Sequence, residues 1–313
     1  MKTKKILINL KRFDVSRSVG GVCDDTDPAN WIENVIDQII TLNLINIPYL
    51  ELSLFVPDAL LKIATNKLNT YDQDSVNKLS IGAQSCHSQD VSIGGNFGAF
   101  TTFNLASTQK TLGGVANIIG HCEERRFYNQ VLQDYFSELD NQSIDLTRAA
   151  KVVSNMINQK IQCALANGMQ TTVCIGETSE ERGVGTEQHQ VENAKQILKT
   201  QLISSLAGIS ASDIEQNITV AYEPVWAIGP GKTPPGKEYI QDISLFIKHI
   251  VKQHFSAQVD VVYGGGLKNE NAAMLASIPS LDGGLIALTN FTAPIGFQTD
   301  ELAKILTTYK GAL

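Results

Sequence analysis

One carboxylate of this chain stands in a setting that suits proton-transfer chemistry. Glu223 ends the apolar run ITVAYE, Pro224 follows it directly, and a glycine-rich turn with Gly229 and Gly231 comes soon after. This order is typical of a strand that ends in an acid and continues into a loop with stiff ends. A loop of this kind can close over a small anion, so we expect Glu223 to act beneath a lid.

Other polar residues also follow predicted strand ends. Asn9 and Lys11 come after the first apolar run, His121 comes after VANIIG, and three glycines end the run VDVVYGGG. Together with Glu223 they supply a candidate base, a neutral or cationic donor, a fixed cation and backbone amides. This set suits abstraction of a proton next to a carbonyl, because the developing enediolate needs electrostatic stabilisation.

The elements that must position these residues alternate regularly along the chain. Strands are predicted over residues 5–9, 48–56, 79–84, 115–121, 171–177, 218–223, 259–266 and 283–288. Helical periodicity or helix-start signals lie between them, for example at Asp27-Pro28 and over residues 146–166. The strands are apolar rather than alternating, as expected when helices cover both faces of a parallel sheet.

About eight strand–helix repeats predict an α/β fold, a closed (β/α)8 barrel. The polar residues at the strand ends then meet at one mouth of the barrel, where active sites of such barrels lie. A doubly wound sheet is the alternative, but the first strand lacks the GxGxxG turn that such folds use for dinucleotides.

We expect residues 1–313 to form a single domain with three insertions, at about residues 13–27, 86–97 and 128–145. The first follows strand one and therefore lies at the mouth, where it can cover the site or add substrate contacts. The second lengthens a polar loop that contains Gly94-Gly95. The third reads as an inserted helix and loop on the outer rim.

Composition narrows the class of partner. The net charge of −7, without any Lys/Arg block, argues against a nucleic-acid-binding surface. No run approaches the ~18–20 apolar residues that span a bilayer, and the start does not resemble a signal peptide. The five cysteines are widely spaced and form no CxxC, so we expect no disulfide framework and no metal site. These features predict a cytoplasmic protein.

Several strings resemble the triosephosphate isomerase family, occur in that family's order and span nearly the whole chain. The most specific is AYEPVWAIGPGKT, which contains Glu223 and the lid. The others are N-x-K at 9–11, GAQ at 82–84 with GAFT at 98–101, GHCEERR at 120–126, CIGET at 174–178 and YGGGLKNENAA at 263–273. The resemblance implies a TIM barrel and a cofactor-independent aldose–ketose isomerase.

Position by position, the resemblance also implies roles. Glu223 is similar to the family's catalytic base, and His121 to the neutral electrophile that polarises the carbonyl. Lys11 is similar to the cation that holds substrate, and Asn9 to its neighbour around the substrate oxygens. This base–histidine pair and the closure of a lid over the site are established features of the family. Taken alone, the lysine would read as a surface charge and the histidine as a structural residue.

Further positions carry supporting roles by the same resemblance. Gly229 matches a lid residue whose backbone N–H grips phosphate. Glu123 matches the carboxylate near the lysine, and Cys174 matches a cysteine that supports the base, although a buried thiol is its plainer interpretation.

The phosphate end departs from the family. Gly266 stands where the family has a serine that helps to fasten the closed lid. Ala287 and Leu288 stand where the family has two glycines whose N–H groups meet phosphate near a helix N-terminus. At these positions the backbone must approach an anion closely, and a leucine side chain hinders that approach. The departure therefore puts the triose phosphate substrate in question more than the proton-transfer chemistry.

The family's subunit contact is altered too. After the histidine the family reads Ser-Glu-Arg-Arg, but this chain reads Cys122-Glu123-Glu124-Arg125. After GAFT the family has Gly-Glu, but this chain has Thr102-Phe103. An ion pair that joins the family's subunits has therefore lost both partners. We expect a homodimer through the loop before Thr101, with a repacked interface.

Three functions remain open on the sequence. The first is interconversion of dihydroxyacetone phosphate and glyceraldehyde 3-phosphate, a step of glycolysis and gluconeogenesis. The second is isomerisation of a related small sugar phosphate, such as a tetrulose phosphate, which Gly266, Ala287 and Leu288 favour. The third is a non-catalytic barrel with a binding or regulatory role. The joint presence of Asn9, Lys11, His121 and Glu223 argues against it, because a barrel without activity has no need of all four.

Overall fold

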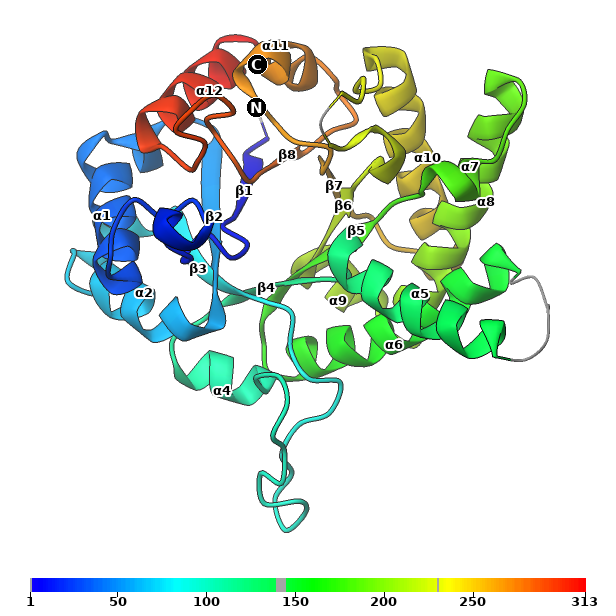
Figure 1. Ribbon diagram of the computed structural model, residues 1–313, viewed down its shortest axis with the longest axis horizontal. Helices are drawn as coiled ribbons and strands as arrows, with labels where there is room; N and C mark the ends of the chain where they lie inside the picture. Colours follow the sequence, from blue (N-terminus) through cyan, green and yellow to red (C-terminus); the bar gives the residue numbers. More distant parts are fainter. Residues whose placement is uncertain (1, 139–144, 230) are drawn as a thin grey trace.

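Eight parallel strands close into a barrel, and helices cover its outside (Figure 1). The structure is a computed structural model and describes residues 2–138, 145–229 and 231–313. The strands are β1 Lys4–Asn9, β2 Leu50–Val56, β3 Leu79–Gln84, β4 Ala116–Ile119, β5 Gln170–Ile175, β6 Ile218–Tyr222, β7 Asp260–Tyr263 and β8 Gly283–Ile286. The predicted (β/α)8 fold is confirmed.

The helices alternate with the strands along the chain. They are α1 Pro28–Thr41, α2 Leu61–Leu68, α3 Gln73–Val76, α4 Ala106–Thr111, α5 Cys122–Ser137, α6 Leu146–Ala166, α7 Ser179–Arg182, α8 Glu187–Ser205, α9 Ala211–Asn217, α10 Lys237–Phe255, α11 Asn269–Ala276 and α12 Thr299–Gly311. As the sequence predicts, Asp27 caps α1: its side chain accepts the N–H of Ala29, and Pro28 fills the first turn. No helix in the described part of the chain is long and apolar enough to cross a membrane.

Closure of the barrel depends on the pairing of β8 with β1. Lys5 stands opposite Gly283, and a Cβ at Gly283 would lie 1.8 Å from the Lys5 carbonyl oxygen. Only glycine allows this approach. A small apolar cluster fills the interior of the barrel, and a larger one lies between the strands and the helices. The side chains that point inward at the mouth are therefore set on a rigid frame.

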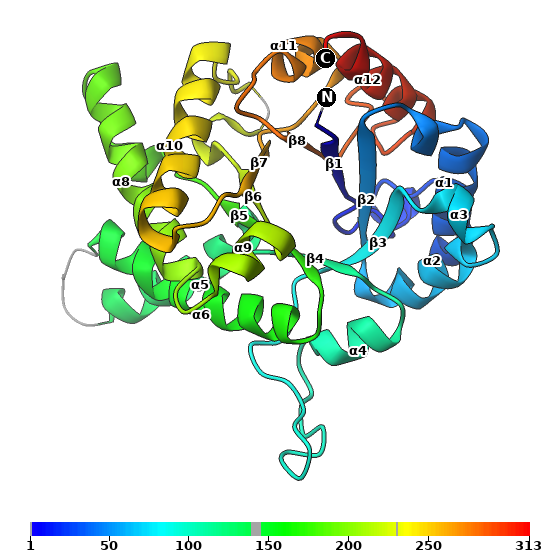
Figure 2. The ribbon, with the colours of Figure 1, turned by 180° about the vertical axis from the view of Figure 1, so that it is seen from behind.

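The three insertions lie at different places on this frame. Residues 13–27 form a loop with a short 3-10 helix, Arg17–Val19. Ser16 and Cys23 pair there in an isolated β-bridge. The loop between β3 and α4 projects far from the barrel in both views (Figures 1 and 2). In the third insertion the expected extra helix is the C-terminal part of α5, which begins at Cys122; residues 139–144 lie outside the described part of the chain.

Candidate active site

Glu223 follows the last residue of β6 and is buried at the mouth of the barrel, with a side chain 3% exposed. Its backbone N–H donates to the Ile175 carbonyl, so the neighbouring strand fixes its position. Oε1 lies 3.1 Å from Nε2 of His121, and Oε2 accepts the N–H of Cys122 at 2.9 Å. A carboxylate held in this way is oriented and largely excluded from water.

His121 stands at the junction of β4 and α5 and caps the helix. Its Nδ1 accepts the N–H of Glu123 at 3.4 Å. An imidazole nitrogen that accepts a hydrogen bond carries no proton, so the ring proton of a neutral His121 lies on Nε2. That N–H faces Glu223, and it can donate to a substrate oxygen at the same place.

Asn9 and Lys11 come from the end of β1. Lys11 has a backbone φ of 44°, a conformation that costs free energy for a non-glycine residue. The Asn9 side chain stabilises this turn, because its Oδ1 accepts the N–H of Lys11 at 3.0 Å and also a hydrogen bond from Gln84. Such strain is commonly found at functional sites.

The Lys11 ammonium pairs with Glu123, with 2.9 Å between Nζ and Oε1. Burial raises the pKa of the Glu123 carboxyl, but the hydrogen bond and charge of Lys11 outweigh burial and lower it overall. Glu123 therefore stays ionised and links Lys11 to the first turn of α5, the helix that His121 caps.

Gly176 allows the backbone of Glu223 to approach β5. A Cβ at Gly176 would lie 1.8 Å from the carbonyl oxygen of Glu223. The glycine of CIGET is thus required by packing around the carboxylate.

Cys174 is fully buried inside the barrel, beside Ala221 on β6. Burial and then the charge of Glu223 raise the pKa of its thiol well above the ordinary value. The Cys174 carbonyl accepts a hydrogen bond from buried Arg125 at 2.8 Å, and the same guanidinium donates to the Gly120 carbonyl. Arg125 thereby joins the end of β4, which leads into His121, to the end of β5, which packs beside Glu223.

The segment expected to form a lid begins with a short 3-10 helix, Val225–Ala227, and Gly229 follows with a φ of 123° that favours glycine. The Trp226 indole N–H donates to Glu177 at 2.7 Å. The guanidinium of Arg182 stacks on the Trp226 ring, 3.9 Å from its centroid. The base of the lid is therefore anchored to the segment after β5.

Glu177 is the residue that the sequence interpretation leaves without a role. Its Oε1 accepts hydrogen bonds from Tyr222, Trp226 and Tyr239, and its side chain is completely buried. Burial raises its pKa to about 7, against the opposing effect of these hydrogen bonds. The signal in the sequence is the carboxylate of CIGE, which follows a buried strand as Glu223 does.

The residues expected to hold phosphate lie at the ends of β7 and β8. Gly266 has a φ of 93°, which a serine would adopt only with strain. Ala287 and Leu288 follow β8 directly, and their side chains pack against the hydrophobic core. Neither has a positive φ, so both are compatible with their backbone.

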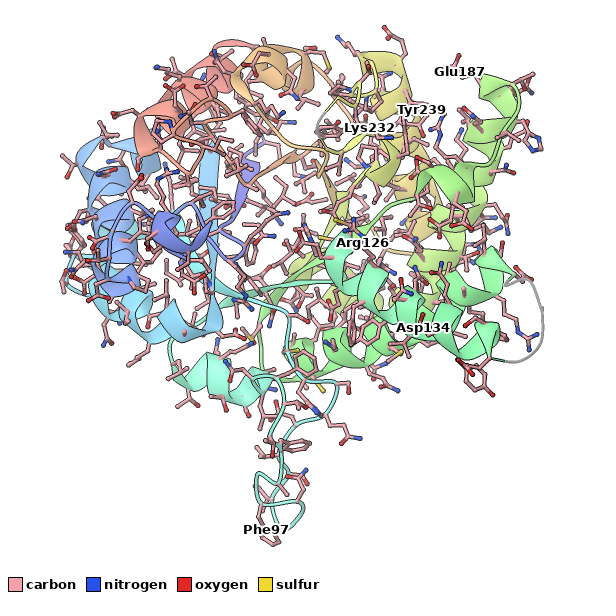
Figure 3. All side chains as sticks on the ribbon, in the orientation of Figure 1. Phe97, Arg126, Asp134, Glu187, Lys232 and Tyr239 are labelled. Carbon is pink, nitrogen blue, oxygen red and sulfur yellow. The ribbon has the colours of Figure 1, made fainter. Side chains whose placement is uncertain are left out.

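Figure 3 relates the lid to α5. Lys232 lies in the segment before α10 and Tyr239 on α10, whereas Arg126 and Asp134 lie along α5 and Phe97 lies at the tip of the projecting loop. Glu223, before the first of these segments, and His121, before α5, meet with 3.1 Å between Oε1 and Nε2.

Comparisons with known proteins agree with this geometry. The family model described as triosephosphate isomerase matches residues 33–294. A triosephosphate isomerase of Chloroherpeton thalassium is 31% identical over 69% of this chain and 72% of that protein. One of Carboxydothermus hydrogenoformans is 33% identical over 66% of this chain and 70% of that protein. A crystal structure of triosephosphate isomerase from Bartonella henselae matches with a TM-score of 0.66 and 24% identity, covering 98% of this chain and 99% of that one.

Proposed function

The chain belongs to the triosephosphate isomerase family, and we propose that it interconverts dihydroxyacetone phosphate and glyceraldehyde 3-phosphate. One observation carries the proposal: a buried carboxylate, Glu223, faces the Nε2 of His121 at the mouth of the barrel. A base beside a neutral hydrogen-bond donor is what enolisation of a carbonyl compound requires.

In the proposed reaction, the Glu223 carboxylate turns away from the Cys122 N–H and takes a proton from C1 of the ketose. The Nε2–H of His121 donates to the carbonyl oxygen and stabilises the enediolate that forms. His121 then moves the hydroxyl proton from the oxygen on C1 to the oxygen on C2, and Glu223 returns its own proton to C2, which gives the aldose without any change in composition or oxidation level overall. No cofactor enters these steps.

Charge and lid contacts complete the proposed site. The ammonium of Lys11 stabilises negative charge on the substrate, and Asn9 holds the strained turn that presents it. Gly229 and Gly266 offer backbone N–H groups to the phosphate. Ala287 and Leu288 offer theirs from the end of β8, because their side chains pack toward the core.

The assay that tests this function compares substrate lengths. Purified protein is expected to turn over triose phosphates with higher kcat/KM than tetrulose phosphates. The family is a standard example of catalysis near the diffusional ceiling of about 10⁸–10⁹ M⁻¹s⁻¹. Fast tetrulose turnover with slow triose turnover would overturn the substrate assignment but leave the proton transfer intact. Inactivity on both would favour a non-catalytic barrel.

A homodimer through the projecting loop is part of the proposal. The loop exposes the residues Ile93 and Phe97, which are 109% and 89% exposed, and such apolar tips are typical of subunit contacts. Glu124, which replaces an arginine of the family, pairs within its own chain with Lys160, with 2.5 Å between the charged atoms. The Lys160 ammonium also lies 4.6 Å from the Phe103 ring centroid. Both altered interface positions, Glu124 and Phe103, therefore contact Lys160 of the same chain.

Light scattering at micromolar concentration is expected to give twice the mass of the chain. Phe97→Asp is expected to weaken the dimer by at least about 2 kcal/mol, roughly 30-fold in Kd, as for a buried aromatic contact. Val184→Asp changes an equally exposed side chain in the loop between α7 and α8 and is the matched control. A monomeric wild-type protein would count against the proposal.

The five cysteines are all free, and this suits the cytoplasmic location that we propose.

A further inference from the structure

We propose that His121, Cys122 and Glu223 form a binding site for a thiophilic divalent cation, of the chemical class of Zn²⁺. Their ligand atoms, one from each residue, all lie within 4.8 Å of one another. A cation there would occupy the catalytic base, so we infer that it inhibits the enzyme reversibly. The inhibition rests on the proposed function, whereas the binding site does not.

The distances approach those of a tetrahedral site. The Nε2 of His121 lies 3.1 Å from Oε1 of Glu223 and 3.9 Å from Sγ of Cys122. Zinc bonds of about 2.0–2.3 Å to nitrogen, oxygen and sulfur place tetrahedral ligands roughly 3.3–3.8 Å apart. The sulfur lies 3.7 Å from Nδ1 and 3.9 Å from Nε2 of the same ring, so the Cys122 side chain has to rotate toward the Nε2 edge before all three ligands hold one ion. The fourth position is left to water.

Cys122 distinguishes this chain, because the family it resembles has serine there. A thiolate is a far stronger ligand for zinc than a hydroxyl group. The proposed isomerisation makes no use of the sulfur: only the backbone N–H of Cys122 touches Glu223. The side chain is thus available for a second role at the same place.

The local charges suit a divalent cation. A thiolate and a carboxylate bring two negative charges, and the imidazole is a neutral ligand, so a bound dication leaves the site uncharged. The nearby Lys11 ammonium is already paired with Glu123 at 2.9 Å.

Protons must move when the ion binds. Cys122 binds the ion as a thiolate, so its thiol must lose a proton on binding. Binding releases that proton to solvent. The His121 proton moves from Nε2 to Nδ1, which gives up only the long 3.4 Å contact with the Glu123 N–H. The net change is one proton released for each ion bound.

Two measurements test the site. Equilibrium dialysis against micromolar ZnCl2 is expected to show one ion per chain, and CoCl2 is expected to give the charge-transfer absorption of a cobalt–thiolate bond. Cys122→Ser should abolish that absorption and weaken zinc binding by at least about tenfold, since even a ligand's hydrogen-bond partner is commonly worth about 10–100-fold. Cys163→Ser, which removes a partly buried thiol on α6, is the matched control and should bind as the wild type does.

The outcomes separate this proposal from the enzymatic one. Loss of zinc binding in Cys122→Ser but not in Cys163→Ser supports the site, even in a protein without isomerase activity. Inhibition of the wild-type rate by zinc, reversed by a chelator and diminished in Cys122→Ser, supports the inhibitory role. Absence of bound zinc from the wild-type protein, or a cobalt–thiolate band that persists in Cys122→Ser, would overturn the proposal. Circular dichroism of each variant verifies that it is folded.

Discussion

Glu223→Gln is expected to lower kcat by about 10²–10⁴-fold, the range found when a general acid–base group is removed. The amide has the same shape as the carboxylate and keeps an oxygen that can accept the Cys122 N–H, which the wild-type carboxylate accepts at 2.9 Å. It has no basicity, so it cannot take the C1 proton. KM should change much less than kcat, because the substrate phosphate is held by other groups.

The matched control is Glu187→Gln, the same substitution at an exposed carboxylate in the first turn of α8. It should leave kcat at the wild-type value. Single-turnover exchange of the C1 proton with deuterated water isolates the chemical step from product release. Wild-type exchange in Glu223→Gln would show that another group is the base, and the assignment of Glu223 would be wrong.

Much of the frame was predictable, because it follows from local patterns. Apolar runs of four to seven residues between helical periodicities marked the strands, and the residue after each run marked the mouth of the barrel. The start of α1 followed from Asp27-Pro28 alone. These features depend on residues that are neighbours in the sequence, so the sequence displays them.

The features that the sequence did not predict depend on contacts between residues that are far apart in the chain. Glu124 and Lys160 are 36 positions apart, and nothing in either segment indicates that they pair. The strained backbone of Lys11 likewise depends on how Asn9 and Gln84 meet across two strands. The role of Glu177 requires three donors from different segments to converge on one oxygen. Composition and periodicity do not indicate which distant residues converge on one atom.

Glu177 provides the second large effect, a dependence of stability on pH. Two forces act on its carboxyl group. Burial raises the pKa, and hydrogen bonds from the backbone N–H of Glu177 and from Tyr222, Trp226 and Tyr239 lower it; burial prevails, and the pKa rises from 4.5 to about 7. The three side-chain donors reach Oε1, whereas Oε2 has no hydrogen-bond partner among the described residues. An ionised oxygen without a partner in the interior explains the direction of the shift.

The sign follows from proton counts. Between pH 4.5 and about 7 the folded protein holds a proton on Glu177 that the unfolded chain has lost, so the free energy of unfolding falls as pH rises. The contribution is fully present below the unfolded pKa and is lost as pH rises through the folded one. A shift of this size corresponds to about 3 kcal/mol in total, most of it lost between pH 5 and 8.

Glu177→Gln removes this titration and keeps the shape of the side chain. Urea unfolding at pH 5 and pH 8 is expected to show that the wild type loses about 2–3 kcal/mol more stability over this range than the variant does. Glu187→Gln again serves as the control and should follow the wild type, because its side chain is exposed. Equal pH dependence in the wild type and Glu177→Gln would mean that the three donors are enough to hold the ionised form. The Trp226 indole N–H would then donate to an ionised Glu177 at neutral pH. The base of the lid would be held by a charged carboxylate rather than by a group that is half protonated.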